Sequence, residues 1–476
     1  TESLVLAALG AALSTCFAIW GLDLLSAVSV GEDAPPLNER VIGFTTVVAV
    51  LASMGFGLMP ALRATRLDLN AEFQGGRGKL GGGPSRLGRA LLIVQVALSL
   101  VLLVGAGLFI RTVSNLRAVN VGFDRSRLVL FSIDASWTGY SPAQANALND
   151  RVGERIAGLP GIDGVTFAGW SILSNMGGFE IGVSIPGYSP PPGERTTVKL
   201  APVAVNYFQT YRIAVLAGRA FEPRDGATAQ KVAVINRAFA RKYFGEENPL
   251  GKTIRQGRDE REVVGLVTDV KQEDLRVPAA PVLFVPLVQS GNGPRTRATF
   301  FTVRTAGEPA PMIGAIRHAV REVDSNLPVI NLRTQDEVVE RRLLSSERLF
   351  ARMSVCLGLL ALALACVGLY GLMSYAVHRR TGEIGVRMAL GALPRTVLAM
   401  ILRESLGLVL LGVGLGLAAA AGATRLVGHL LYGLSPMDAP TYAAVALVLI
   451  VVASVAALLP ARRAAKVDPV VALRSE

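Results

Sequence analysis

Six long apolar stretches constrain this chain more than any other feature of its sequence. Each is long enough to cross the hydrocarbon core of a bilayer as a helix, which takes roughly 20 residues. They lie at residues 3–22, 41–62, 90–110, 349–375, 397–423 and 441–459. Of the 476 residues, 51% are hydrophobic and 18% are charged, too few charges to cover a soluble protein of this length. The sequence therefore predicts a polytopic α-helical membrane protein.

The net charge of +12 is concentrated in the loops on one side of these stretches. Basic residues follow the second, fourth and sixth stretches, and among them are Arg63, Arg66, Arg77, Lys79, Arg86, Arg89, Arg379, Arg380, Arg387, Arg395, Arg462, Arg463, Lys466 and Arg474. The short loops on the other side, residues 23–40 and 428–440, hold several acids and few cations. By the positive-inside rule the basic loops are cytoplasmic. The charge thus indicates topology and contact with anionic lipid, and we expect no nucleic-acid partner.

Two segments near the start of the chain recur near its end. Glu2-Ser3-Leu4 returns as Glu404-Ser405-Leu406, and LMPALRATRLD (58–68) resembles LLPARRAAKVD (458–468), in both cases about 400 residues later. So long an offset indicates a duplicated unit rather than a solenoid.

The duplication predicts how the chain is divided. Residues 1–76 are expected to be the tail of a first unit, and residues 77–87 a flexible, Gly-rich, basic cytoplasmic linker. Residues 88–112 then hold the first membrane span of a second unit, followed by an outer domain at 113–345 and further spans at 346–476. Because the chain opens at Thr1 on the edge of an apolar stretch, we expect further residues upstream.

Residues 113–345 are polar enough to be soluble, and the topology puts them outside the cytoplasm. Alternating apolar and polar residues predict strands at 128–134, 232–235, 263–267, 282–285 and 300–303. Helical periodicity predicts helices at 143–157, 236–243 and 311–323. These patterns predict a mixed α+β domain that divides into lobes near residues 170 and 260.

No catalytic, cofactor or metal site can be recognised in the sequence. Its histidines, far apart along the chain, are His318, His378 and His429, and its cysteines, all inside apolar stretches, are Cys16, Cys356 and Cys366. The segment NPLGKTI (248–254) contains the Gly-Lys-Thr of a phosphate loop, but Glu246 stands where that loop needs glycine. We therefore predict no catalytic, cofactor-binding or metal-ligating residue and no enzyme activity of the chain itself.

Residues 381–393 form a short amphipathic segment between two spans on the basic side. In a helix from Gly382, Glu383 and Arg387 are four apart and can pair. Ile384, Val386 and Met388 would offer an apolar patch. Periodicity alone fits two interpretations equally: a contact for a cytosolic protein and a helix lying on the lipid surface. The candidate contact residues are Glu383, Ile384, Gly385, Val386, Arg387, Met388 and Leu390.

Three residues inside the apolar stretches are candidates for helix packing. Gly412 and Gly416 have the GxxxG spacing that lets two helices approach closely. Gln95 is costly in lipid unless it is hydrogen-bonded. For Gln95 we favour an interhelical hydrogen bond over a substrate site.

Several segments, in order along the chain, resemble the MacB/FtsX-like permeases of ABC transporters. They include QVALS (95–99), VAVNYFQTY (203–211), VINRAFARKYF (234–244), ACVGLYGLMSYAVHRRTGEIGVRMALGA (365–392) and LLPARRAAKVDPVVALR (458–474). The chain resembles in particular the duplicated orphan (ADOP-type) permeases, which are encoded without a fused ATPase, and would be a C-terminal fragment of one.

The resemblance implies a fold. Residues 113–345 would be a MacB-like periplasmic core domain with porter lobes at 113–170 and 263–345 and an inserted sabre lobe. Residues 346–476 would be an FtsX-like permease domain with its coupling helix at 381–393.

The resemblance also implies a function. The chain would be the transmembrane subunit of an ABC transporter in the bacterial cytoplasmic (inner) membrane. It would couple ATP hydrolysis in a separate ATPase subunit, which binds the ATP and magnesium, to movement of the outer domain for export, efflux or mechanotransmission. Further partners would be a second permease unit, from the same full-length chain or a homodimer, and a periplasmic adaptor or hydrolase. The alternative is a non-transporting membrane scaffold that regulates a periplasmic hydrolase or sensor.

Overall fold

The computed structural model describes residues 86–135, 139–173, 179–193, 196–290, 298–379, 386, 388, 390 and 393–464. The chain divides into two units, which we call the membrane unit (Thr1–Ser114 with Ser345–Glu476) and the outer unit (Asn115–Leu344). The predicted spans at 3–22 and 41–62, and most of the predicted linker at 77–87, lie outside the described residues. The outer unit is therefore inserted in the chain between two parts of the membrane unit.

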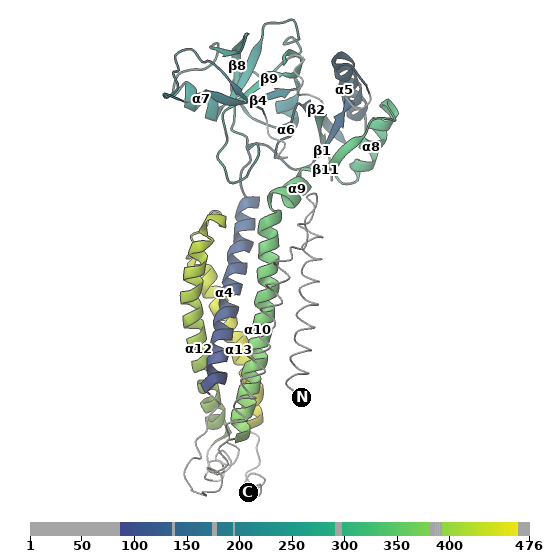
Figure 1. Cartoon of the computed structure of the whole chain (residues 1–476). Coiled ribbons are helices and arrows are strands. Elements are labelled where there is room, and N and C mark those ends of the chain that lie inside the picture. The colour runs from purple at the N-terminus through teal and green to yellow at the C-terminus, as the bar shows by residue number, and fades with distance from the viewer. Residues whose placement is uncertain are drawn as a thin grey trace. The chain divides into compact units, whose positions relative to one another are not determined.

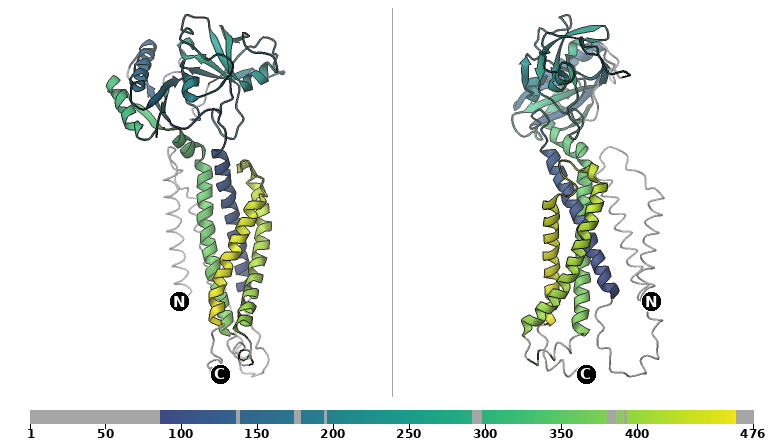
Figure 2. Two further views of the ribbon diagram at one scale, coloured as in Figure 1. Left: turned by 180° about the vertical axis from the view of Figure 1, so that it is seen from behind. Right: turned by 90° about the vertical axis from the view of Figure 1, so that its left-hand side faces the viewer.

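Four helices of the membrane unit, among the described residues, are long and apolar enough to cross a bilayer. They are α4 (Arg86–Arg117), α10 (Ser345–Arg379), α12 (Pro394–Leu426) and α13 (Ala439–Ala464), and they run alongside one another in both views of Figure 2. The four spans predicted after residue 88 each lie inside one of these helices. Pro394 stands in the first turn of α12, where its missing N–H costs no hydrogen bond. The 3₁₀ turn η4 (Gly428–Leu430) follows α12.

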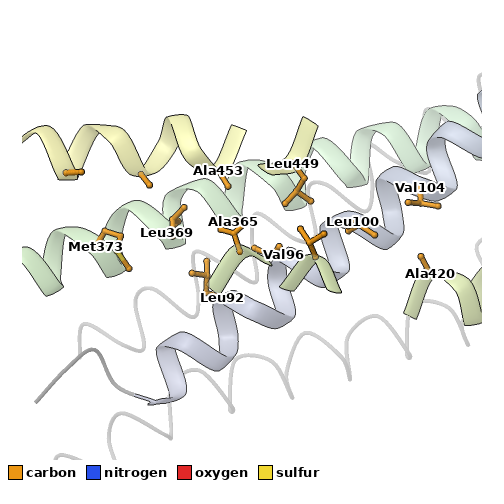
Figure 3. Packing of buried hydrophobic residues seen from close by; sticks show 14 of the residues in the cluster. Leu92, Val96, Leu100, Val104, Ala365, Leu369, Met373, Ala420, Leu449 and Ala453 are labelled. Atoms are coloured by element: carbon orange, nitrogen blue, oxygen red, sulfur yellow. The ribbon is translucent and has the colours of Figure 1, made fainter. Parts of the chain in front are cut away.

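One face of α4 forms the centre of this bundle. Its buried side chains recur every four residues and so share a face; they are Leu92, Val96, Leu100, Val104 and Leu108. The neighbouring helices contribute both small residues, such as Ala365 and Ala453, and larger ones, such as Leu369, to the same cluster (Figure 3). The outward face of α4 is also apolar, because Val94 and Leu98 are 64% and 54% exposed. An apolar exterior around a close-packed interior is what a lipid solvent requires.

The first lobe of the outer unit is a split β-α-β fold. Its elements are β1 (Leu128–Asp134), α5 (Pro142–Ala157), β2 (Ile162–Ala168), β10 (Ala298–Thr305), α8 (Met312–Val323) and β11 (Val329–Thr334). The strands lie in the order β11-β1-β10-β2, all antiparallel, and α5 and α8 lie side by side on the sheet (Figure 1). Ser141 caps α5 through a capping box with Gln144. The short α9 (Gln335–Val338) and the π-helical η3 (Val339–Leu343) then lead back to the membrane unit.

The second lobe is inserted between β2 and β10. It contains β3 (Phe179–Gly182), β4 (Thr197–Val203), α6 (Tyr207–Tyr211), β5 (Val215–Gly218), β6 (Val232–Asn236), α7 (Arg237–Tyr243), β7 (Thr253–Gln256), β8 (Asp259–Val267), β9 (Val282–Pro286) and the 3₁₀ turn η2 (Leu287–Gln289). The main strand order is β4-β9-β6-β8-β5, with β4–β9 and β6–β8 parallel. The sheet is continuous with that of the first lobe only through one residue pair, Ala168 with Val203. We call this junction the seam.

The position at which the chain returns to the first lobe differs from the prediction. The sequence placed the return at residue 263, but β8 and β9 belong to the second lobe and the chain returns at β10, residue 298. The reason is that alternation identifies a strand without identifying its partners. All five predicted strands and three predicted helices are present.

Candidate functional site

The candidate contact segment at 381–393 is described at three of its residues. The N–H of Leu390 donates to the carbonyl oxygen of Val386 at 3.0 Å, which is one turn of helix. Val386 is 45% exposed and Leu390 is 83% exposed. Met388 is half-buried and packs against the core of the bundle. The turn therefore presents two aliphatic side chains outward while a third holds it to the membrane helices.

The orientation of Met388 differs from the sequence expectation. We expected Ile384, Val386 and Met388 to share one apolar patch, but Met388 faces the bundle and Val386 is exposed. Residues two apart on a helix point in nearly opposite directions, which is why they cannot share a face. Of the predicted contact residues, Glu383, Ile384, Gly385 and Arg387 lie outside the described residues.

The two candidate packing glycines lie at the contact between α12 and α4. A methyl group at Gly412 would come within 2.8 Å of the Cβ of Val96. A methyl group at Gly416 would lie 3.0 Å from both the Cα and the carbonyl oxygen of Ala97. Both glycines are buried, so a larger residue at either position would force the two helices apart.

Gln95 lies at the contact between α4 and α10. Its carboxamide oxygen would be 3.4 Å from a methyl group built on Gly368. Within the described part of the chain, no hydrogen bond to the Gln95 side chain is seen; Ser99 donates to the Gln95 backbone oxygen at 2.8 Å. The structure thus places this amide against a small residue, and the interhelical bond expected for Gln95 stays a prediction.

Sequence analysis missed two ion pairs that join α4 to other helices. Near one end of α4, Nη2 of Arg89 lies 2.6 Å from Oε1 of Glu404 in α12. Near the other end, Arg111 pairs with Asp438, which immediately precedes α13. Hydrogen bonds from Thr441, aided by Arg111, lower the pKa of Asp438. The one hint of the first pair in the sequence was the repeated Glu-Ser-Leu triplet, which contains Glu404.

A buried arginine links the two lobes of the outer unit. Arg304, in β10, donates from Nε to the carbonyl oxygen of Thr210 in α6 at 2.6 Å, and from Nη2 to that of Asp124 at 2.6 Å. Its Nη1 lies 3.2 Å from Oδ2 of Asp124. Burial acts to raise the pKa of Asp124, but hydrogen bonds from Ser126 and the charges of Arg304 and Arg212 outweigh it and lower the pKa. These bonds reinforce the sparsely paired seam.

The outer unit offers no metal site among its described residues, since none of its described His, Cys, Asp and Glu side chains form a group of three that could hold an ion. The Gly-Lys-Thr segment is a turn at Gly251 that leads into strand β7, whereas a phosphate loop opens a helix. Lys252 pairs with Glu247 instead. The segment therefore does not have the geometry of a nucleotide site.

Two known protein-family models match the two parts of this architecture. The MacB-like periplasmic core domain model matches residues 90–319, and the FtsX-like permease C-terminal model matches residues 355–469. The chain is a permease of the MacB/FtsX type. The matched regions include α4 with most of the outer unit and then α10, α12 and α13, so this ABC permease family accounts for all four described spans.

Individual relatives of this permease agree. It is 30% identical over 283 residues to the macrolide export ATP-binding/permease protein MacB of Chlorobium luteolum, covering 54% of this chain and 40% of that protein. It is 24% identical over 298 residues to the uncharacterized ABC transporter permease YknZ of Bacillus subtilis, covering 60% of this chain and 71% of that protein. The alignments thus span less than half the length of the ATP-binding/permease relatives named MacB.

Among solved structures, the outer unit is similar to the periplasmic region of MacB from Actinobacillus actinomycetemcomitans. The match has 14% identity and a TM-score of 0.33, and it covers 48% of this chain and 96% of that one.

Proposed function

We propose that this permease couples ATP hydrolysis in a separate ATPase subunit to movement of its outer unit. The observation that carries the proposal is the turn at Val386–Leu390. It exposes two aliphatic side chains on the side that the positive-inside rule assigns to the cytoplasm. Exposed aliphatic groups of this kind suit a protein contact, and the anchor at Met388 gives that contact a connection to the bundle.

A continuous set of packed residues leads from this turn to α4. Met388 packs against the same core cluster that contains Val96 and Leu100 of α4. Close-packed interiors are poorly compressible and transmit displacement. The chain passes from α4 directly into the outer unit, which begins at Asn115. Displacement of the turn would therefore be conveyed through α4.

The described core of the bundle is closely packed, which supports transmitted movement as its mode of action. A cavity between α4, α10 and α13, lined by residues that include Val96, Leu362 and Leu449, measures about 10 Å³. That is at the lower limit of what a single water needs. Export and efflux would then be driven by the outer unit, and mechanotransmission needs no lumen at all.

The proposal includes the partners of the chain. ATP and magnesium would be bound by the ATPase subunit, and this chain would have no ATPase activity of its own. A second permease unit, membrane lipids, and a periplasmic adaptor or hydrolase would complete the assembly, with the outer unit facing away from the cytoplasm of a bacterial cell. In the alternative function, a scaffold regulating a hydrolase or sensor, the exposed turn would have no ATPase to contact.

The test is co-purification of an ATP-binding subunit with the tagged chain, combined with the ATPase rate of the pair. Leu390→Asp should weaken the contact at least tenfold, because burying a leucine contributes about 1.5–3 kcal/mol. Val277→Asp, at a residue of the outer unit that is 57% exposed, is the matched control and should have no effect. Co-purification and stimulation that survive Leu390→Asp, or no ATPase bound to the wild type, would contradict the proposal.

A further inference from the structure

A cleft of about 810 Å³ lies between the two lobes of the outer unit. One wall comes from α5 and β2 of the first lobe. The other comes from the end of β4, α6 and η2 of the second lobe. Small-molecule sites have volumes of roughly 300–1,000 Å³, so the cleft can hold a drug-sized molecule.

The first wall carries three carboxylates. Asp150 and Glu154 are four residues apart on α5 and so lie on one face, and Asp163 stands at the start of β2. All three line the cleft, and none has a hydrogen-bond or ion-pair partner among the described residues. Burial, and then the nearby charge of Glu154, raise the pKa of Asp150. The two carboxylates on α5 therefore have no paired cation among the described residues.

The two arginines that line the cleft are engaged elsewhere. Arg212 lies 2.9 Å from Oδ2 of Asp124. The buried Arg304 is close enough to Asp163 to feel its charge, but its donors go to Thr210, Ser126 and Asp124. Neither arginine offsets the acids on α5.

The second wall is largely apolar. Val205, Leu287 and Val288 line it, and Val288 is 52% exposed. Phe167 of β2 also faces the cleft and is half-buried. A ligand here would meet aliphatic surface on the second wall, and Phe167 together with negative charge on the first.

We propose that this cleft binds an organic cation with an apolar body, such as a substituted ammonium or phosphonium carrying hydrocarbon groups. A coordinated metal ion is a poorer match, because no three of the described acidic, His or Cys side chains are grouped to hold one. A small anion would be repelled by Asp150 and Glu154. The cation would contact both lobes across the seam. The inference does not depend on the proposed coupling function, because binding requires no ATPase.

The experiment uses the full chain in an uncharged detergent and tetraphenylphosphonium as the probe. Free probe is measured with a tetraphenylphosphonium-selective electrode, and empty micelles give the background partitioning. The test variant is Asp150→Asn with Glu154→Gln. Glu246→Gln with Glu308→Gln is the matched control, because it removes two exposed carboxylates outside the cleft.

The expected result is saturable binding to the wild type that the test variant weakens about tenfold, since each exposed charge pair contributes up to about 1 kcal/mol. The control variant should bind like the wild type. If the test variant does not fold, as judged by gel filtration and circular dichroism, Asp163→Asn replaces it with an expected loss of about threefold. Non-saturable binding, or equal binding by the wild type and the test variant, would overturn the proposal.

Discussion

The close contact between α12 and α4 can be tested with a single methyl group. In Gly416→Ala the new Cβ would lie 3.0 Å from the Cα and the carbonyl oxygen of Ala97 and 3.0 Å from the Cβ of Leu100. Two of these three atoms are backbone, which no side-chain rotation can move. The helices would have to separate by a few tenths of an ångström.

The magnitude follows from two opposing effects. Overpacking a close-packed contact costs about 1–3 kcal/mol. Replacing glycine by alanine inside a helix returns as much as about 1 kcal/mol. The net loss expected for Gly416→Ala is therefore about 1–2 kcal/mol. Gly414 is the matched control, because it has no heavy atom within 4 Å of a built Cβ, and Gly414→Ala should be neutral or stabilising.

The assay is unfolding of the purified chain in mild detergent by added sodium dodecyl sulfate, followed by circular dichroism. Gly416→Ala should unfold at a lower mole fraction of sodium dodecyl sulfate than the wild type, and Gly414→Ala at the same or a higher one. Equal midpoints for the two alanine variants would refute the argument that α4 and α12 pack backbone to backbone at this position.

Two further predictions concern ion pairs. In a double-mutant cycle of unfolding free energies made with Arg89→Gln and Glu404→Gln, the two residues should show a coupling energy of about 0.5–1 kcal/mol. If the effects of the two single substitutions simply add, the ion pair does not contribute to stability. Asp225, which is 4% exposed, accepts hydrogen bonds from Nη1 and Nη2 of Arg219 at 2.7 and 2.9 Å. Burial acts to raise the pKa of Asp225, but the hydrogen bonds from Arg219 and from the Glu222 N–H outweigh burial and lower the pKa. A lowered folded-state pKa contributes stability above the unfolded-state pKa, about 3.9, and that stability is lost as the pH falls through the folded-state value. Asp225→Asn should thus destabilise the outer unit by about 2 kcal/mol at neutral pH, and thermal unfolding at pH 7 and pH 3 should show the difference narrowing in acid; a constant difference would count against the ion pair.

Local patterns in the sequence predicted local structure well. The strand at 128–134 is β1 residue for residue, and the helix expected at 143–157 is α5 with Pro142 added in its first turn. The four spans were predictable because lipid requires about 20 apolar residues in a row. Each of these signals is contained in one contiguous segment.

Pairing between distant segments was not predictable. The strands at 263–267 and 282–285 were found, but their partners β6 and β4 follow from the topology of the whole sheet. The contact between Arg89 and Glu404 joins residues 315 positions apart. The direction of the Met388 side chain likewise depends on which side of its turn meets the bundle. Periodicity does not identify that side in a segment of small and apolar residues.

The junction between the two lobes has a mechanical consequence. At the seam, backbone hydrogen bonds join residues 167–169 to residues 202–204. The Arg304 side chain adds bonds to carbonyl oxygens of both lobes, those of Thr210 and Asp124. Lysine carries the same charge but cannot span these acceptors with one compact ammonium group. The flat, forked shape of this guanidinium thus helps to set how stiffly one half of the outer unit follows the other.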